Sequence, residues 1–150
     1  MRNLLTDVEF RRVSASVAAG QGTTDCTIVD MEGYDEVTFV LALGTVVNDG
    51  VVTFQIAHAD TNDTGEMAVT TATTGAITSD GTLIALSDKL LAVTVTKPEK
   101  RYLEAQVVKA TQNAEIDGVI AILSKGRTQP AVQGTTVYDA KLFHTPEDAA

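Results

Sequence analysis

The chain has 150 residues, of which 44% are hydrophobic, and its formal net charge is −9. This length is typical of a single globular domain, and the negative charge disfavours nucleic acid and anionic membranes as principal partners. A single cysteine, Cys26, excludes an internal disulfide and is typical of a protein that folds in a cytoplasm. No apolar run approaches the roughly 20 residues that span a bilayer, and the N-terminal residues lack the apolar stretch of a secretory signal.

Alternating apolar residues predict β-strands along most of the chain. Helical periodicity is nearly absent; the best candidate, residues 82–91, would form only one or two turns before a strand. Seven to nine short strands separated by turns predict an all-β fold, an antiparallel β-sandwich or jelly-roll-like single domain with extended termini. In chain order the predicted strands cover residues 10–19, 25–31, 36–43, 51–58, 66–71, 75–79, 90–96, 101–108 and 117–124.

Two of these strands carry the clearest pattern. Residues 36–43 place Val37, Phe39, Leu41 and Leu43 on one face, and residues 51–58 do the same with Val52, Phe54 and Ile56. Between them, Asn48, Asp49 and Gly50 favour the left-handed backbone of a tight turn. The pair is therefore predicted to be a hairpin with one buried face.

Composition changes after Pro130, where the alternating pattern becomes weaker. We divide the chain into an N-terminal arm (1–9), a β-sandwich domain (10–130) and a C-terminal arm (131–150). The C-terminal arm carries an apolar patch, Leu142 and Phe143, and ends in acidic residues. Two interpretations stay open at this point: a frayed terminus, or an arm that becomes ordered on a neighbouring subunit.

Residues that could perform chemistry are few and badly spaced. Cys26 could form a triad only with His58 or His144, but it lies within a predicted strand rather than at the exposed turn that a nucleophile usually occupies. Residues 60–66 partly match a calcium-binding loop, but the twelfth position, which needs a bidentate glutamate, is Thr71. We therefore expect no enzyme, no metal site and no cofactor.

Charge is distributed unevenly along the chain. Between Lys89 and Arg127 there are seven basic residues and four acidic ones, whereas the rest of the chain is strongly acidic. The turns at 97–101 and 125–128 could form a basic edge that binds an acidic neighbour. The alternative is that these charges are solvated and only prevent edge strands from pairing.

The stretch "KPEKRYLEAQVV" (97–108), together with "DGVVTFQIAHADTND" before it and "TQNAEIDGVIAILSKGRTQP" after it, resembles a family of small head proteins of tailed bacteriophages and prophages. The similarity covers roughly residues 8–130 and is most specific at the Arg101-Tyr102 pair and at residues 113–123. It implies a minor capsid or capsid decoration (cement) protein, made in the bacterial cytoplasm and located on the capsid exterior.

Membership of that family would also imply partners and contact residues. The partners would be the major capsid protein and further copies of the chain, as a homotrimer at threefold positions, and neither nucleic acid nor membrane. The contacts would lie on the basic edge, the adjacent strand and the C-terminal arm, at Lys97, Lys100, Arg101, Tyr102, Arg127, Leu142 and Phe143. The alternatives are a head completion, connector or tail-associated protein, and a carbohydrate- or calcium-binding module on the virion.

Overall fold

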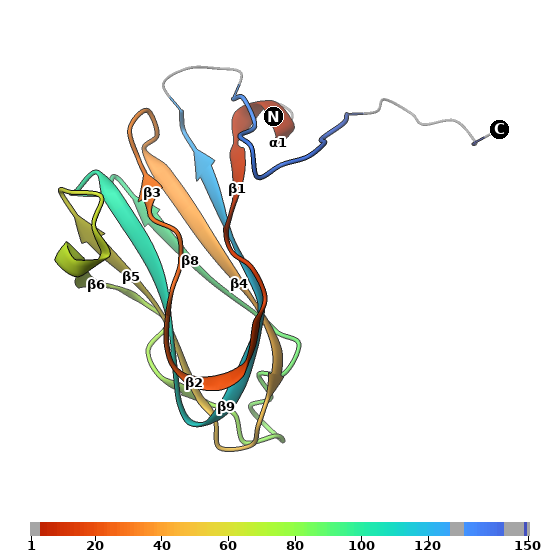
Figure 1. Ribbon diagram of the computed structural model, residues 1–150. Helices are drawn as coiled ribbons and strands as arrows, with labels where there is room; N and C mark the ends of the chain where they lie inside the picture. The colour runs from red at the N-terminus through yellow and green to blue at the C-terminus, as the bar shows by residue number, and fades with distance from the viewer. Residues whose placement is uncertain (1–3, 127–130, 143–148, 150) are drawn as a thin grey trace.

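The computed structural model describes residues 4–126, 131–142 and 149 and shows an all-β protein, as the sequence predicts (Figure 1). None of the helices in these residues is long and apolar enough to cross a membrane. In chain order the elements are α1 (Leu4–Asp7), β1 (Glu9–Ser14), β2 (Val17–Asp25), β3 (Val29–Asp30), β4 (Glu36–Val46), β5 (Val51–Ala59), the 3-10 turn η1 (Thr64–Glu66), β6 (Ala68–Thr73), β7 (Ile77–Thr78), β8 (Leu90–Thr96) and β9 (Tyr102–Ser124).

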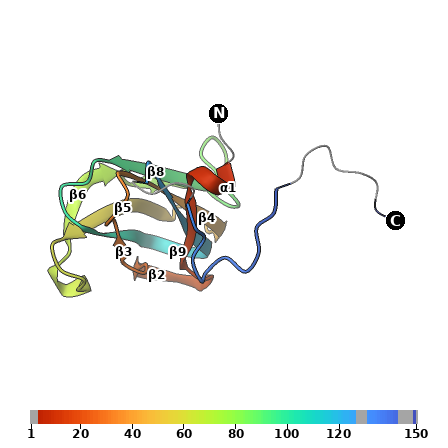
Figure 2. The same cartoon turned by 90° about the horizontal axis from the view of Figure 1, so that it is seen from above.

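All nine strands belong to one antiparallel sheet that is curled into a half-barrel (Figure 2). The sheet is continuous because β9 passes through both of its halves. Residues 102–110 of β9 pair with β5 on one side and with β3 and the end of β2 on the other, and residues 114–124 pair with β4 and β1. The predicted sandwich or jelly roll, which needs two separate sheets, is not seen in the described residues.

The bend of β9 lies between its two paired segments. Thr111 has a positive φ of 69°, which lets the strand reverse direction, and Gly22 of the neighbouring β2 has a positive φ of 101° near the same level. The sequence predicts two separate strands here, 101–108 and 117–124. The structure instead joins them into one sharply bent strand.

The turn between β4 and β5 is where it was predicted, but the hairpin prediction is wrong. Asp49 adopts the left-handed conformation, with a φ of 70°, and the N–H of Gly50 donates to the carbonyl of Val47. Among the described residues, however, β4 pairs with β8 and β9, and β5 pairs with β6, β7 and β9. The bent β9 separates the two strands, each of which pairs with a different half of it.

The core lies inside the curl and confirms the predicted inward faces. Alternate residues of β4, β5 and β9 point into it, so that Phe39 and Phe54 are completely buried. Leu91, Val93 and Val95 of β8 close the core from the side. The other fully or almost fully buried apolar residues of these three strands are Val37, Leu41, Leu43, Val46, Val52, Ile56, Ala57, Ala59, Leu103, Ala105, Val107, Ala114, Ile116, Val119, Ala121 and Leu123.

Residues 82–91, the helix candidate, do not form a helix. Residues 82–89 make turns held by the side chain of Asp80, which accepts hydrogen bonds from the N–H groups of Thr82 and Ile84, and Leu90 then begins β8. Short polar side chains offer the backbone such local bonds in place of helical ones.

The chain after the gap at 127–130 packs against β1 before it leaves the body of the molecule. Gln133 accepts a hydrogen bond from the N–H of Phe10 and donates to the carbonyls of Val8 and Leu5, and Thr136 accepts one from the N–H of Arg12. Side chains of the C-terminal segment thus form hydrogen bonds with backbone groups on the outer edge of β1. The end of this segment extends away from the sheet (Figure 1), and Tyr138 is fully exposed.

Candidate functional site

The predicted basic residues lie at the end of the half-barrel where β9 begins and ends. The 97–101 turn between β8 and β9 faces the 31–35 turn across a cleft of about 480 Å³. Lys97 has a positive φ of 51°, and its N–H donates to the carbonyl of Asp35 at 2.7 Å. This backbone bond fixes one turn to the other.

Arg101 forms hydrogen bonds and ion pairs with two acidic side chains of its own chain. Its Nε and Nη2 donate to the two carboxylate oxygens of Asp30, each at 2.8 Å, and Nη2 also donates to Glu32 at 2.6 Å. The guanidinium lies 5.1 Å from the ring centroid of Tyr102. The hydrogen bonds from Arg101 hold the pKa of the Asp30 carboxyl below its ordinary value, while Asp30 raises the pKa of Arg101.

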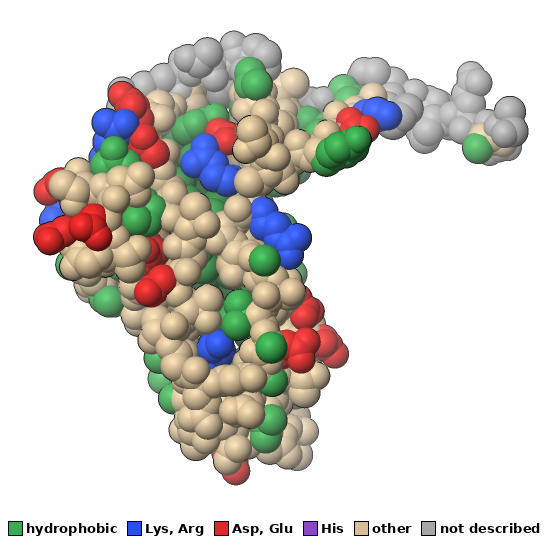
Figure 3. All heavy atoms as spheres, in the orientation of Figure 1, with side chains coloured by type: hydrophobic (Ala, Val, Ile, Leu, Met, Phe, Trp, Pro, Cys, Tyr) green, Lys and Arg blue, Asp and Glu red, His purple; other side chains and the backbone are tan. Residues whose placement is uncertain are grey.

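Most of the remaining basic residues at this end are paired in the same way. Lys100 lies 3.8 Å from Asp60, and Lys125 lies 2.6 Å from Glu36. Among the described residues Lys97 makes no ion pair. Figure 3 shows basic and acidic side chains lying next to each other at this end. The folded chain thus supplies acidic partners for Lys100, Arg101 and Lys125, and a role of this end in binding a neighbour stays a prediction.

Two of the predicted contact residues, Arg127 and Phe143, lie outside the described residues. Leu142 is 55% exposed and lies on the segment that extends from the body, so the structure does not bring it together with the 97–101 turn. Tyr102 is half-buried beneath Arg101, and it pairs with Asp30 and Ala59 on the neighbouring strands.

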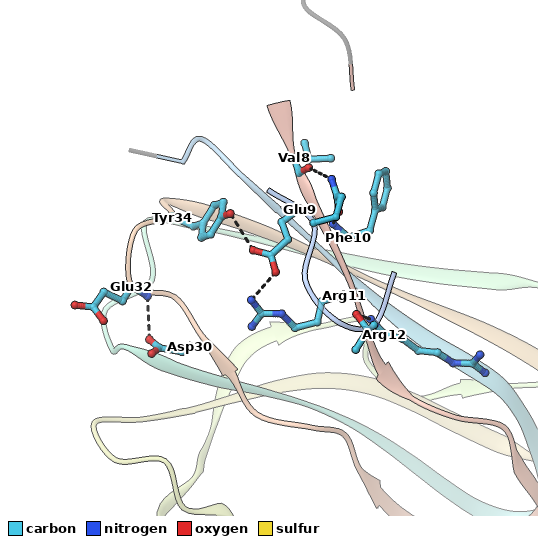
Figure 4. A network of polar contacts seen from close by, with 10 residues as sticks. Val8, Glu9, Phe10, Arg11, Arg12, Asp30, Glu32 and Tyr34 are labelled. Carbon is cyan, nitrogen blue, oxygen red and sulfur yellow. Dashed lines mark hydrogen bonds and ion pairs between the residues drawn. The ribbon is translucent and has the colours of Figure 1, made fainter. Parts of the chain in front are cut away.

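A second polar cluster ties β1 to the 31–35 turn (Figure 4). The buried carboxylate of Glu9 accepts a hydrogen bond from the Tyr34 hydroxyl at 2.9 Å and one from Arg11 at 2.8 Å. Burial, with the bond to Glu9, raises the pKa of Tyr34 to about 12. Each group has a partner, so this cluster stabilises the fold and leaves no group free to bind a ligand.

Of the residues considered for catalysis and metal binding, His144 lies outside the described residues. Cys26 is buried, and burial raises the pKa of its thiol to about 12, with smaller contributions from Glu104 and Asp25. In the 60–66 loop, Asp63 uses its carboxylate to accept the N–H of Gly65. No three acidic, histidine or cysteine side chains in the described part of the chain are grouped as a metal site would require.

The sequence reasoning missed an apolar surface on the outside of the sheet. The side chains that alternate with the core positions of β4 and of the second half of β9 should be polar on a solvated face. Instead, Val40 lies between Ile120 and Ala92, and Ala42 lies between Gly118 and Leu90. Leu90 is 68% exposed and Ile120 is 45% exposed. The signal was present in the sequence: residues 39–43 are apolar on both faces.

We call this surface the outer apolar face and define it by Phe10, Val40, Ala42, Leu90, Ile120 and Val137. It is hollowed into a groove of about 630 Å³. Arg12 and Asp117 lie at the polar margin of the groove, and Val137 brings the C-terminal segment to the same margin. An exposed apolar groove with a polar rim is typical of a protein contact surface.

Comparisons with known proteins agree with the fold and give no family. Neither a protein-family model nor a curated protein sequence matches the chain. Among solved structures, the chain is similar to the crystal structure of the PBSX exported protein XepA, with a TM-score of 0.52 and 19% sequence identity. The similarity covers 95% of this chain and 46% of that one, so the chain spans about half the length of the protein it matches. At this identity the likeness concerns the fold: the chain has the architecture of a prophage-encoded protein.

Proposed function

We propose that the chain is a non-enzymatic structural protein of a phage or prophage particle, and that it decorates the outside of a capsid by binding the major capsid protein. The outer apolar face carries this proposal. It exposes large aliphatic side chains on a four-stranded part of the sheet, and nothing in the described residues covers it. The structural similarity to a prophage protein and the family resemblance of roughly residues 8–130 support the same setting.

The ion pairs at the 97–101 turn indicate which forces would hold such a protein on the capsid. The ion pairs at the 97–101 turn are internal, and exposed pairs contribute only ~0–1 kcal/mol each, so attraction at this end would orient the protein more than retain it. Retention would come from apolar burial, for which a stable contact needs roughly 800 Å² per partner. Many copies on one shell would also bind multivalently.

The test is the stoichiometry of the chain in purified particles, compared between wild type and one outer-face variant. We expect many copies at a fixed ratio to the major capsid protein, and at least a tenfold lower ratio for Ile120→Glu, which puts a charge at the centre of the outer apolar face. Leu83→Glu, at a fully exposed leucine in the 82–89 turns, is the matched control and should bind as wild type does.

Two other results would overturn the proposal. A few copies at a single vertex would make the chain a connector or tail-associated protein. Absence from particles together with presence in the culture medium would indicate an exported protein, as the name of the PBSX exported protein XepA says of that protein.

A further inference from the structure

Strand β8 has one edge without a partner. It pairs with β4 over residues 36–42 and 90–96, and no other described strand pairs with it. Natural proteins protect an edge strand with charges, prolines or bulges. The sequence of β8, LLAVTVT, contains no charge and no proline, and its pairing with β4 has no register shift. Strand β6 approaches the end of β8 at Val95 and Thr96, so the part of the outer edge that a further strand could use is 90–94.

The register identifies the groups that this edge offers. The N–H of Leu43 donates to the carbonyl of Lys89, its directly opposite residue, so odd-numbered residues of β8 form the hydrogen-bonded pairs with β4. The even-numbered residues therefore point their N–H and C=O groups away from β4. They are Leu90, Ala92, Thr94 and Thr96, whose side chains lie on the outside of the sheet, where Leu90 joins the outer apolar face.

The C-terminal segment has the pattern of a strand but no sheet to join. In residues 138–142, Tyr138, Ala140 and Leu142 alternate with Asp139 and Lys141, which form an ion pair at 3.2 Å. Extended backbone places the first three on one face and the charged pair on the other. Tyr138 is fully exposed and Leu142 is more than half exposed. An amphipathic segment of this kind is stabilised by pairing with an open edge.

The segment cannot pair with the edge of its own β8. Its root is held on β1, where Thr136 accepts the N–H of Arg12. The order of strands in this half of the sheet is β1, β9, β4, β8, so the free edge lies at least three strand spacings away, about 14 Å. Five extended residues span about 17 Å in all. The crossing would use nearly the whole of 138–142, and none would remain to run alongside β8.

We propose that residues 138–142 of one copy add as a strand to the free edge of β8 in a second copy. The added strand would pair its main chain with the outward groups of Ala92 and Thr94. Tyr138, Ala140 and Leu142 would extend the outer apolar face beyond Leu90, and the ion pair of Asp139 and Lys141 would stay in solvent on the other side. The free edge of β6 does not adjoin this apolar surface, which is why β8 is the acceptor.

The experiment measures the mass of the isolated protein by light scattering over a range of concentrations, and amide hydrogen exchange of residues 138–142. Neither measurement needs particles, so the result is independent of the proposed decoration role. We expect a multimer with protected amides in 138–142 for the full chain. Leu142→Asp should shift the mass to that of the monomer and remove the protection, because it puts a charge on the apolar face of the added strand.

The acceptor is tested by Ala92→Pro, which removes an outward N–H and leaves the hydrogen bonds to β4 intact. This variant should also be monomeric, and Thr94→Lys, which protects the edge with a charge, provides the same test if Ala92→Pro does not fold. Leu83→Asp is the control and should remain multimeric. A full chain that stays monomeric, a multimer that survives both the arm and the edge variants, or protected arm amides in a monomer would each overturn the proposal.

Discussion

At the scale of single residues, the ion pairs decide the character of the end that carries the 97–101 turn. In the sequence, Lys97, Lys100 and Arg101 follow one another closely and suggest a basic edge. Folding brings Asp30 of β3 and Glu32 of the following turn to Arg101, and Asp60 of the loop after β5 to Lys100, from positions far away in the chain. The net charge of this surface depends on pairs of residues that only the strand order brings together.

The Arg101 pair predicts a specific pH dependence. The pKa of Asp30 is lower in the folded chain than in the unfolded one, chiefly because of the hydrogen bonds from Arg101. The pair therefore stabilises the fold above the ordinary pKa of the carboxyl, and this contribution is lost as pH falls through the folded pKa. In Arg101→Gln, we expect the Asp30 carboxyl resonance to titrate at a higher pH than in the wild type, although the N–H of Glu32 still donates to this carboxylate.

NMR titration of both proteins measures this shift. Lys97→Gln is the control, because Lys97 makes no ion pair in the described residues, and it should leave the titration of Asp30 unchanged. An Asp30 pKa that does not rise in Arg101→Gln would contradict the assignment of this pair.

At the scale of elements, the loop before β6 is held to the outside of the sheet by one buried charge. Glu104 of β9 is completely buried, and its carboxylate accepts hydrogen bonds from Thr64 of η1 at 2.7 Å and from Gln106 at 3.0 Å. Gln55 of β5 donates to Gln106 in turn. The network joins η1, β9 and β5, and each buried side-chain group in it has a partner.

We expect Thr64→Val to lower the free energy of unfolding by about 1–3 kcal/mol, because it removes one of the donors to a buried carboxylate. Thr61→Val, in the same loop but at an exposed side chain, should change it by less than about 0.5 kcal/mol. Urea denaturation of the three proteins measures both values. Equal effects of the two substitutions would mean that Glu104 is satisfied without Thr64.

The positions and buried faces of the strands were easier to predict from the sequence than the partners with which the strands pair. The inward faces of β4 and β5 follow from alternation alone, since Phe39 and Phe54 are buried as predicted. Alternation does not specify the partner of a strand. The hairpin was inferred only from the turn residues at 48–50, and these do not determine which strands pair. The outcome depends on Thr111, whose left-handed backbone has no sequence signature in a β-branched residue. The outer apolar face was predictable only in part: residues 39–43 are apolar on both faces, but its other members come from β1, β8, β9 and the C-terminal segment.

At the scale of the whole molecule, the C-terminal region has two parts with different roles. Residues 131–137 belong to the body, since Gln133 bonds to β1 and to the turn before it. Residues 138–142 contribute apolar side chains to no part of the described core. The predicted arm of 131–150 thus includes a segment that stabilises the domain and one that is available to a second copy.

Truncation separates these parts. Removal of residues 138–150 should leave the melting temperature of the domain unchanged when both proteins are compared as monomers. In the truncated chain, Gln133→Ala should lower the free energy of unfolding by about 1–3 kcal/mol, because it leaves the Phe10 N–H and two carbonyls without these partners. Thermal and urea denaturation measure the two effects. A large loss on truncation alone would place residues 138–150 in the domain core.

The bent strand β9 also governs when the chain can fold during synthesis. It follows all the other strands of the described residues in the chain, and it is the partner of β1, β2, β3, β4 and β5. At roughly 5–20 residues per second, these earlier strands wait for several seconds with their apolar faces exposed on the nascent chain. The sheet therefore cannot form completely until β9 has been synthesised.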